Sequence, residues 1–388
     1  MKNKNRKLLP AVTQGIFALL LFSALVIGAA DSTIPDSRSM QESAMVSGIE
    51  EAVTSTIQKT EGTAKLVGIP VKSIEVSVVP KLRLVPCGDV FGVKFFTKGV
   101  MIVGMSDVES TEGILNPAYK SGLRVGDTIT SLDGKEVNTV EEVAEAVEKS
   151  GGQKINVSFS REGESGSTTI VPLKSLTDGK FKTGLWVRDS TAGIGTITFY
   201  NPENGEFAGL GHGICDVDTG KLMPMLSGNI VDIKITDIIR GVEGTPGELK
   251  GEFGIVKSGE LYKNTEMGVF GVLYNKPDCG TENALEIAPS SEIKEGKAHI
   301  YSSLGDDKVQ KYEIEITKLF HNDSKTKNLI FRVTDSSLTE KTGGIVQGMS
   351  GSPIVQNGKL VGAVTHVLVN DPGKGYGIFI ENMLNAAE

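Results

Sequence analysis

The chain has 388 residues, a formal net charge of −8 and a pI near 5.3. This length exceeds one typical domain and predicts two domains plus a leader, while the acidic balance argues against a general nucleic-acid binder. Cys87, Cys215 and Cys279 are too few and too scattered for a disulfide framework, and their odd number leaves at least one thiol free. No zinc-ligand spacing is present, and neither a metal nor a cofactor is expected.

Residues 1–30 form the expected export signal or membrane anchor. The first seven residues, MKNKNRK, carry four positive charges, and an apolar run follows that ends in small residues before Asp31. Counted from Leu8, the run reaches about the 20 residues that cross a bilayer, so a cleaved signal and a retained anchor both stay open. The positive end should remain cytoplasmic, which places everything after Asp31 across the membrane. Residues 31–84 predict a polar linker or spacer, which becomes extended between Ile69 and Leu84.

Residues 85–175 predict strands with two helices. Asn116 and Pro117 begin a short helix, and Thr139 with Glu142 forms a capping box for a second helix. The segment AYKSGLRVGDTITSLDGKEV resembles a PDZ domain of the kind attached to bacterial exported peptidases, which binds an extended peptide beside one strand. The resemblance implies that the carboxylate of that peptide binds at Phe91, Gly92 and Val93. It also implies that Val143 and Val147 line the groove, and a purely structural role in the core is the alternative for both valines.

Residues 183–388 contain short β-rich segments separated by Asn and Gly turns, and long amphipathic helices are absent. This pattern predicts a β-barrel or a pair of barrels, so the chain as a whole is expected to be mainly β.

The segment from Gly343 to Val369 is the strongest candidate for an active site. Its order Gly348-Met349-Ser350-Gly351-Ser352-Pro353 is that of the nucleophile loop in chymotrypsin-like peptidases, and Asn357-Gly358 predicts a tight hairpin turn. Ser350 is the expected nucleophile, with Ser352 as the fallback, and the amides of Gly348 and Ser350 are the expected oxyanion donors. A Gly/Ser-rich loop without chemistry is the alternative.

A serine nucleophile needs an imidazole to accept its proton and an acid to orient that imidazole. His212 lies in a glycine-flanked loop and is the expected base, whereas His366 lies on the hairpin strand expected to run along the substrate. The two other histidines, His299 and His321, lie in polar stretches. Asp335 follows a predicted strand and is the expected acid, with a helix cap or a turn as its alternative role.

Three residues close to His212 have other expected roles. Asp216 and Asp218 are expected to stabilise a turn, because acids so near the base in sequence usually do so. Cys215 is conceivable as a catalytic thiol, but a buried small apolar residue is the favoured interpretation.

The order of leader, PDZ domain and peptidase domain, with LGHGICD and TGGIVQGMSGSPIVQNGKLVGAVTHVLVNDPGKGYGIFIENML, resembles the stage IV sporulation protein B peptidases of endospore-forming Firmicutes. The resemblance implies a chymotrypsin-like double barrel with His212, Asp335 and Ser350 as its triad. It also implies a serine endopeptidase made in the forespore and exported to the space between the forespore membranes. There the enzyme would cleave itself near its amino end. It would also cleave a membrane-anchored regulator of an intramembrane protease, which then activates the late mother-cell sigma factor. The PDZ domain would bind peptide in the same or another copy of the chain.

Two other functions stay open from the sequence. A PDZ-centred protein with an inactive barrel would act by tethering peptides. A general envelope quality-control peptidase would usually carry its PDZ domain after the protease domain, and here the order is reversed.

Overall fold

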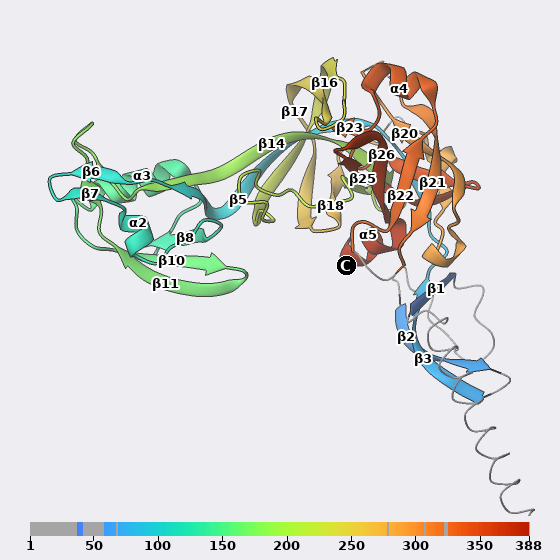
Figure 1. Cartoon of the computed structure of the whole chain (residues 1–388), viewed down its shortest axis with the longest axis horizontal. Coiled ribbons are helices and arrows are strands. Elements are labelled where there is room, and N and C mark those ends of the chain that lie inside the picture. The colour runs from blue at the N-terminus through green and yellow to red at the C-terminus, as the bar shows by residue number, and fades with distance from the viewer. Residues whose placement is uncertain are drawn as a thin grey trace, which may run out of the picture.

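The computed structural model describes residues 37–41, 58–66, 69–277, 279–305, 308–321 and 325–387 (Figure 1). The predicted signal or anchor at residues 1–30 lies outside these residues. Within the ranges just given, no helix is long and apolar enough to span a bilayer.

The segment expected to be a spacer contains a small sheet. Its strands lie in the order β1 (Ser37–Gln41), β3 (Ile69–Val79) and β2 (Gln58–Leu66). The extended conformation predicted from Ile69 onward is therefore confirmed, but it belongs to a sheet and not to an isolated linker.

The elements predicted for a PDZ domain form a small lobe at one end of the molecule (Figure 1). They are β6 (Val108–Ser110), β7 (Gly113–Leu115), α2 (Pro117–Lys120), β8 (Thr128–Leu132), β9 (Lys135–Glu136), α3 (Val140–Lys149), β10 (Ile155–Arg161), β11 (Glu164–Ile170), β12 (Leu173–Lys174) and β13 (Phe181–Lys182). Both helices begin as predicted. The Asn116 side chain accepts the amide hydrogen of Tyr119, and Thr139 and Glu142 cap each other's backbone amides reciprocally.

Six strands beyond the small lobe pair in a closed circuit, here called the first circuit. They are β5 (Val90–Met105), β16 (Met225–Ile239), β17 (Gly247–Thr265), β18 (Gly268–Leu273), β15 (Glu206–Gly209) and β14 (Leu185–Tyr200), which returns to β5. β4 (Arg83–Pro86) and β19 (Leu285–Glu286) continue the sheet beside β14. The interior of the first circuit is apolar and includes Phe91, Val93 and Phe207.

The two 16-residue strands β5 and β14 connect the small lobe to the first circuit (Figure 1). Near the circuit, residues 90–96 of β5 pair with β14, and β14 pairs with the far end of β5 again at Met105. The small lobe is therefore inserted between two strands of the first circuit. The prediction starts the PDZ domain at residue 85, whereas β4 pairs with β14, and residues 90–97 of β5 pair with β14 and β16 of the first circuit.

Phe91, Gly92 and Val93 do not form the carboxylate-binding loop predicted for them. They lie inside β5, where Phe91 and Val93 are 3% and 4% exposed and Phe91 packs edge-on against Phe207. A Cβ on Gly92 would meet the Phe253 ring. The apolar-Gly-apolar triplet is thus part of a buried strand in which the glycine leaves room for an aromatic ring. It resembles the PDZ loop only in its sequence.

Six strands between residues 296 and 379 form a closed barrel. Its strands are β20 (Gly296–Ser302), β21 (Gln310–Leu319), β22 (Leu329–Val333), β26 (Asp371–Phe379), β25 (Lys359–Leu368) and β24 (Pro353–Gln356). The remaining elements are η2 (Thr281–Asn283), η3 (Ser290–Glu292), α4 (Ser336–Thr342), β23 (Val346–Gln347) and α5 (Ile380–Ala387). Asn357 and Gly358 both have positive φ angles, which confirms the tight turn predicted between β24 and β25.

Candidate active site

A cavity of about 1020 Å³ lies where the first circuit meets the closed barrel. Gly195 and Leu210 line it from the first circuit, and Ser350 and His366 line it from the closed barrel. His212 also lines it, from the loop that follows β15. The structure therefore brings the predicted nucleophile and the predicted base, which are 138 positions apart in sequence, to one cavity.

The loop that carries Ser350 is held in place by Thr196 of β14. The buried Thr196 hydroxyl donates to the carbonyl oxygen of Gly348 at 2.8 Å, and the Thr196 amide donates to the carbonyl oxygen of Ser350 at 2.9 Å. Gly348 and Gly351 have φ angles of +99° and +98°, which side chains with a Cβ rarely adopt. A Cβ on Gly351 would also collide with the Thr196 carbonyl. Two glycines and one threonine hydroxyl thus fix the position of Ser350.

The amides of the loop divide into used and unused donors. Those of Met349, Gly351 and Ser352 donate to backbone carbonyls. The amides of Gly348 and Ser350 donate to no other group among the described residues, and both residues line the cavity. Unused amides at the wall of a cavity are the donors that an oxyanion requires.

The Ser350 hydroxyl is half-buried and donates to the Thr365 carbonyl at 2.7 Å, so it does not contact His212 in this conformation. The fallback nucleophile Ser352 is fully buried, and its hydroxyl has no hydrogen-bond partner among the described residues. Of the two serines, only Ser350 lines the cavity.

Two residues in left-handed conformation, Leu210 and Gly211 with φ angles of +67°, turn the chain so that His212 reaches the cavity. Nδ1 of His212 lies 2.9 Å from the Gly213 carbonyl oxygen. A carbonyl only accepts, so Nδ1 carries the hydrogen and Nε2 keeps its lone pair. Burial lowers the pKa of His212 from its usual value, and the hydrogen bond to Gly213 opposes this in part. The ring is therefore held as a neutral base.

The His366 ring contacts the His212 ring, and sequence reasoning missed this contact. The ring centroids of His212 and His366 lie 5.0 Å apart, with 37° between the planes. Partial shielding from water, the neighbouring His212 and then Lys327 lower the pKa of His366 to about 4. The spacing of 16 residues after Ser350 places His366 on the hairpin strand, but only the fold reveals its contact with His212.

Asp335 does not meet His212 in this structure. Its carboxylate caps α4 by accepting from the amides of Ser337 and Leu338, and it also accepts from the Glu313 amide at 3.2 Å. These contacts lower its pKa against the opposing effect of burial, and Asp335 is not among the residues that line the cavity. The helix-cap alternative describes its position, and the predicted pairing with His212 is not present.

Of the two acids near His212, Asp216 has the turn role predicted for it. Asp216 accepts the amides of Asp218 and Thr219 and forms an ion pair with Arg188, which also pairs with Asp218 at 2.8 Å. Cys215, by contrast, is exposed and lines the cavity, so its predicted burial is wrong. Partial shielding of the thiol from water and the nearby Glu266 and Asp216 raise its pKa, which works against a reactive thiolate.

The predicted peptide groove of the small lobe is filled by the chain itself. The residues of β14 from Leu185 to Arg188 pair antiparallel with β5, where an added peptide strand would lie. Val143 and Val147 are 5% and 7% exposed and belong to the lobe's core, with Leu185 packed against it. In this conformation the two valines therefore have the structural role in the core that was the alternative for them. A peptide could pair with this edge of β5 only by displacing β14.

Two family models match the chain. The one described as SpoIVB peptidase S55 matches residues 179–384, and the one described as a PDZ domain matches residues 116–161. The second match confirms the PDZ prediction for the small lobe.

Among solved structures, the PDZ domain of the SdrC-like protein Lmo2051 from Listeria monocytogenes aligns at 19% identity over 23% of this chain and 87% of that chain, with a TM-score of 0.19. The Ser343Ala mutant of Rv3671c from M. tuberculosis H37Rv, an inactive form, aligns at 12% identity over 50% and 80%, with a TM-score of 0.28. A second inactive form of the Rv3671c protease aligns at 13% identity over 50% and 82%, with a TM-score of 0.26.

Proposed function

Because the chain belongs to the SpoIVB peptidase S55 family, a family of serine peptidases, we propose that it is a serine endopeptidase in which Ser350 attacks and His212 accepts the proton. The observation that carries this proposal is the shared cavity. Gly348, Ser350 and His212 all line it, and the amides of Gly348 and Ser350 have no acceptor among the described residues. The closed circuit of six strands beside a closed barrel supports the proposal of a chymotrypsin-like double barrel.

The chemistry follows from these positions. Rotation of the Ser350 side chain away from the Thr365 carbonyl would direct its hydrogen to Nε2 of His212. The hydroxyl oxygen then attacks the peptide carbonyl, and the two amides stabilise the negative oxygen that forms. His212 afterwards delivers the proton to the leaving amine, and water repeats the sequence to release the acyl group. The Gly213 carbonyl accepts a hydrogen bond from Nδ1 and so orients the His212 ring, which is the role expected of the acid in a catalytic triad. Asp335 would have to leave its helix cap to share that role.

A free strand edge supports an extended peptide as the substrate. β24 pairs with β25 only as far as Ala363, and the Ser352 and Gly351 backbone continues the contact to Val364. Beyond that, His366 and Val367 line the cavity. An extended substrate can add to this edge through main-chain hydrogen bonds, which places its scissile bond beside Ser350.

Family membership supports the biological part of the proposal. We propose that the enzyme acts in endospore formation, after export across the forespore membrane, and that it cleaves itself and a membrane-anchored regulator of an intramembrane protease. The small lobe would bind peptide in the same or a second copy of the chain, with β14 displaced from β5. No cofactor takes part in this mechanism.

One observation favours a second function. The Ser350 hydroxyl is engaged by Thr365 and not by His212, as it would be in a barrel that tethers peptides without cutting them.

Expression of the wild type beside Ser350→Ala and Ser352→Ala separates the two functions. The endopeptidase should produce amino-terminal fragments in the wild type and in Ser352→Ala, where a buried hydroxyl without a partner is removed. Ser350→Ala should remain intact. Equal fragmentation of all three chains, or of none, would leave only the tethering function.

A further inference from the structure

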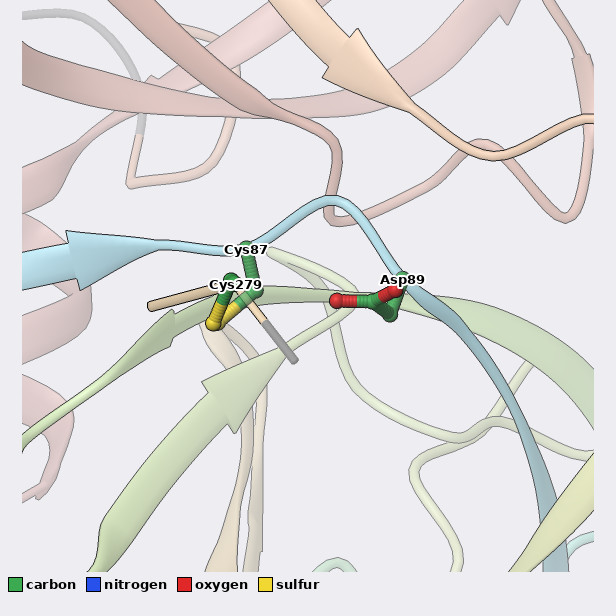
Figure 2. A group of neighbouring side chains, drawn as sticks. All are labelled: Cys87, Asp89 and Cys279. Atoms are coloured by element: carbon green, nitrogen blue, oxygen red, sulfur yellow. The ribbon is translucent and has the colours of Figure 1, made fainter. Parts of the chain in front are cut away.

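We propose that Cys87 and Cys279 form a disulfide bond and that Cys215 is the remaining free thiol. The two sulfur atoms lie 2.7 Å apart although the residues are 192 positions apart in sequence (Figure 2). A disulfide has an S–S length of about 2.0 Å, so the sulfurs need to approach by only about 0.7 Å more. Cys215 lies in the wall of the active-site cavity and has no sulfur partner among the described residues.

A metal site fits this geometry less well. Asp89 places a carboxylate oxygen within 4.8 Å of both sulfurs, and its side chain is turned towards them in Figure 2. Two thiolates at about 2.3 Å from a tetrahedral zinc would lie about 3.8 Å apart, which is well beyond the separation found here. Structural zinc sites also use four protein ligands, and the described residues supply three at this place. The sulfur separation therefore favours a covalent bond.

The burial of the two residues indicates the order of the reaction. Cys87 is 1% exposed, whereas Cys279 is only partly buried, so an oxidant meets Cys279 first. With a small disulfide such as oxidised glutathione as the oxidant, the Cys279 thiolate attacks one sulfur of that disulfide and expels one thiolate. Cys87 then loses its proton, attacks the Cys279 sulfur and expels the second thiolate. Two protein thiols are oxidised, and one small disulfide is reduced to two thiols.

The surroundings of Cys87 make the bond persistent once it has formed. Burial first, and then the hydrogen bond to Cys279 and the charges of Cys279 and Asp89, raise the pKa of the Cys87 thiol well above its usual value. Burial and Asp89 still act when Cys279 is bonded to another sulfur. A reductant that attacks the more accessible Cys279 sulfur must expel Cys87 as a thiolate. A thiolate with a high pKa leaves slowly, so the bond should resist reduction.

The bond also supports the strand behind the nucleophile. The amides of Cys87 and Gly88 donate to the carbonyls of Thr198 and Ile197 on β14, directly beside Thr196. Thr196 in turn holds the Ser350 loop. A bond from Cys87 to Cys279 fastens the segment after β18 to this position.

The test uses the full chain with Ser350→Ala, so that self-cleavage does not interfere. The protein is incubated with oxidised glutathione, freed of it, denatured, alkylated and weighed by mass spectrometry. We expect one alkylated cysteine, Cys215, and three after reduction. Peptide mapping should recover Cys87 joined to Cys279.

Two variants serve as controls. In the same background, Cys215→Ser should show no alkylated cysteine before reduction, and Cys279→Ser should show two. Cys279 is partly exposed, so its replacement by serine spares the fold better than a change at Cys87. Three alkylated thiols in the oxidised Ser350→Ala chain, a bridge that includes Cys215, or one tightly bound zinc per chain with three thiols after chelation would each overturn the proposal.

Discussion

Replacing Thr196 by Val should destabilise the loop that carries Ser350, without changing a residue that contacts the substrate. Valine has nearly the same shape but no hydroxyl, so the Gly348 carbonyl loses the donor that lies 2.8 Å away. Because Thr196 is fully buried, water cannot replace it. A buried acceptor left without its donor costs about 1 to 3 kcal/mol. The free energy of unfolding should fall by that amount.

Turnover should fall as well, because the peptide unit between Gly348 and Met349 then keeps only the hydrogen bond from the Met349 amide to the Val346 carbonyl, and the oxyanion amides on either side of it are held less firmly. The loss of one such donor typically costs about 100- to 1000-fold in kcat, and we expect a loss that approaches the lower figure. Urea unfolding in a Ser350→Ala background gives the stability, and hydrolysis of a peptide substrate gives kcat.

Thr198 provides the matched control on the same strand. It is also fully buried, but its hydroxyl has no hydrogen-bond partner among the described residues. Thr198→Val should therefore be neutral or slightly stabilising and should keep its kcat. If the two variants lose the same stability and activity, the hydrogen bond from Thr196 to Gly348 does not have the role assigned to it.

Four further predictions follow. Asp335→Asn should keep its helix cap and most of its activity, whereas Asp335→Ala should lose about 1 kcal/mol of stability. A fall of about 10⁴-fold in kcat for the folded Asp335→Asn variant would instead identify Asp335 as the acid partner of His212. The lowered pKa of His212 should move the acid limb of the kcat/KM profile below the usual histidine value of about 6.5, and a limb above that value would contradict its burial as a neutral base. The pKa of His366 is about 4 in the folded chain and about 6.5 in the unfolded chain, so the unfolded chain binds the proton first as the pH falls. The stability is therefore full above a pH of about 6.5 and falls as the pH approaches 4. Urea titrations of the wild type and of His366→Asn would show this fall. Reduction of the bond between Cys87 and Cys279, which closes a loop of 192 residues, should remove up to about 5 kcal/mol in the chain-entropy model, and an unchanged midpoint of urea unfolding after complete reduction would argue against a structural bond.

Features that depend on a few neighbouring residues were predictable from the sequence. The capping box at Thr139 and the turn at Asn357-Gly358 depend on local backbone chemistry, and both are present. The loop around Ser350 was predictable for the same reason, because its glycines are needed wherever the chain must adopt positive φ angles. His212 could be selected because glycines on both sides mark a loop that presents a side chain.

Features that depend on distant strand pairing were not predictable. The triplet at Phe91 has the local pattern of a PDZ loop, and only its pairing with β14 and β16 shows that it belongs to the first circuit. Asp335 shows a related limit, since a residue at the end of a strand can face a base or cap the following helix, and the sequence DSS is compatible with both roles. The contacts of His366 with His212 and of Cys87 with Cys279 join segments whose spacing in sequence carries no signal.

Covalent labelling tests the central assignment most directly. A fluorophosphonate that reacts with activated serines, followed by peptide mapping, should place one adduct on Ser350 in the wild type. The adduct should be lost in His212→Ala, although that chain stays folded. An adduct at another serine, or labelling of Ser350 that persists without His212, would contradict the proposed pair.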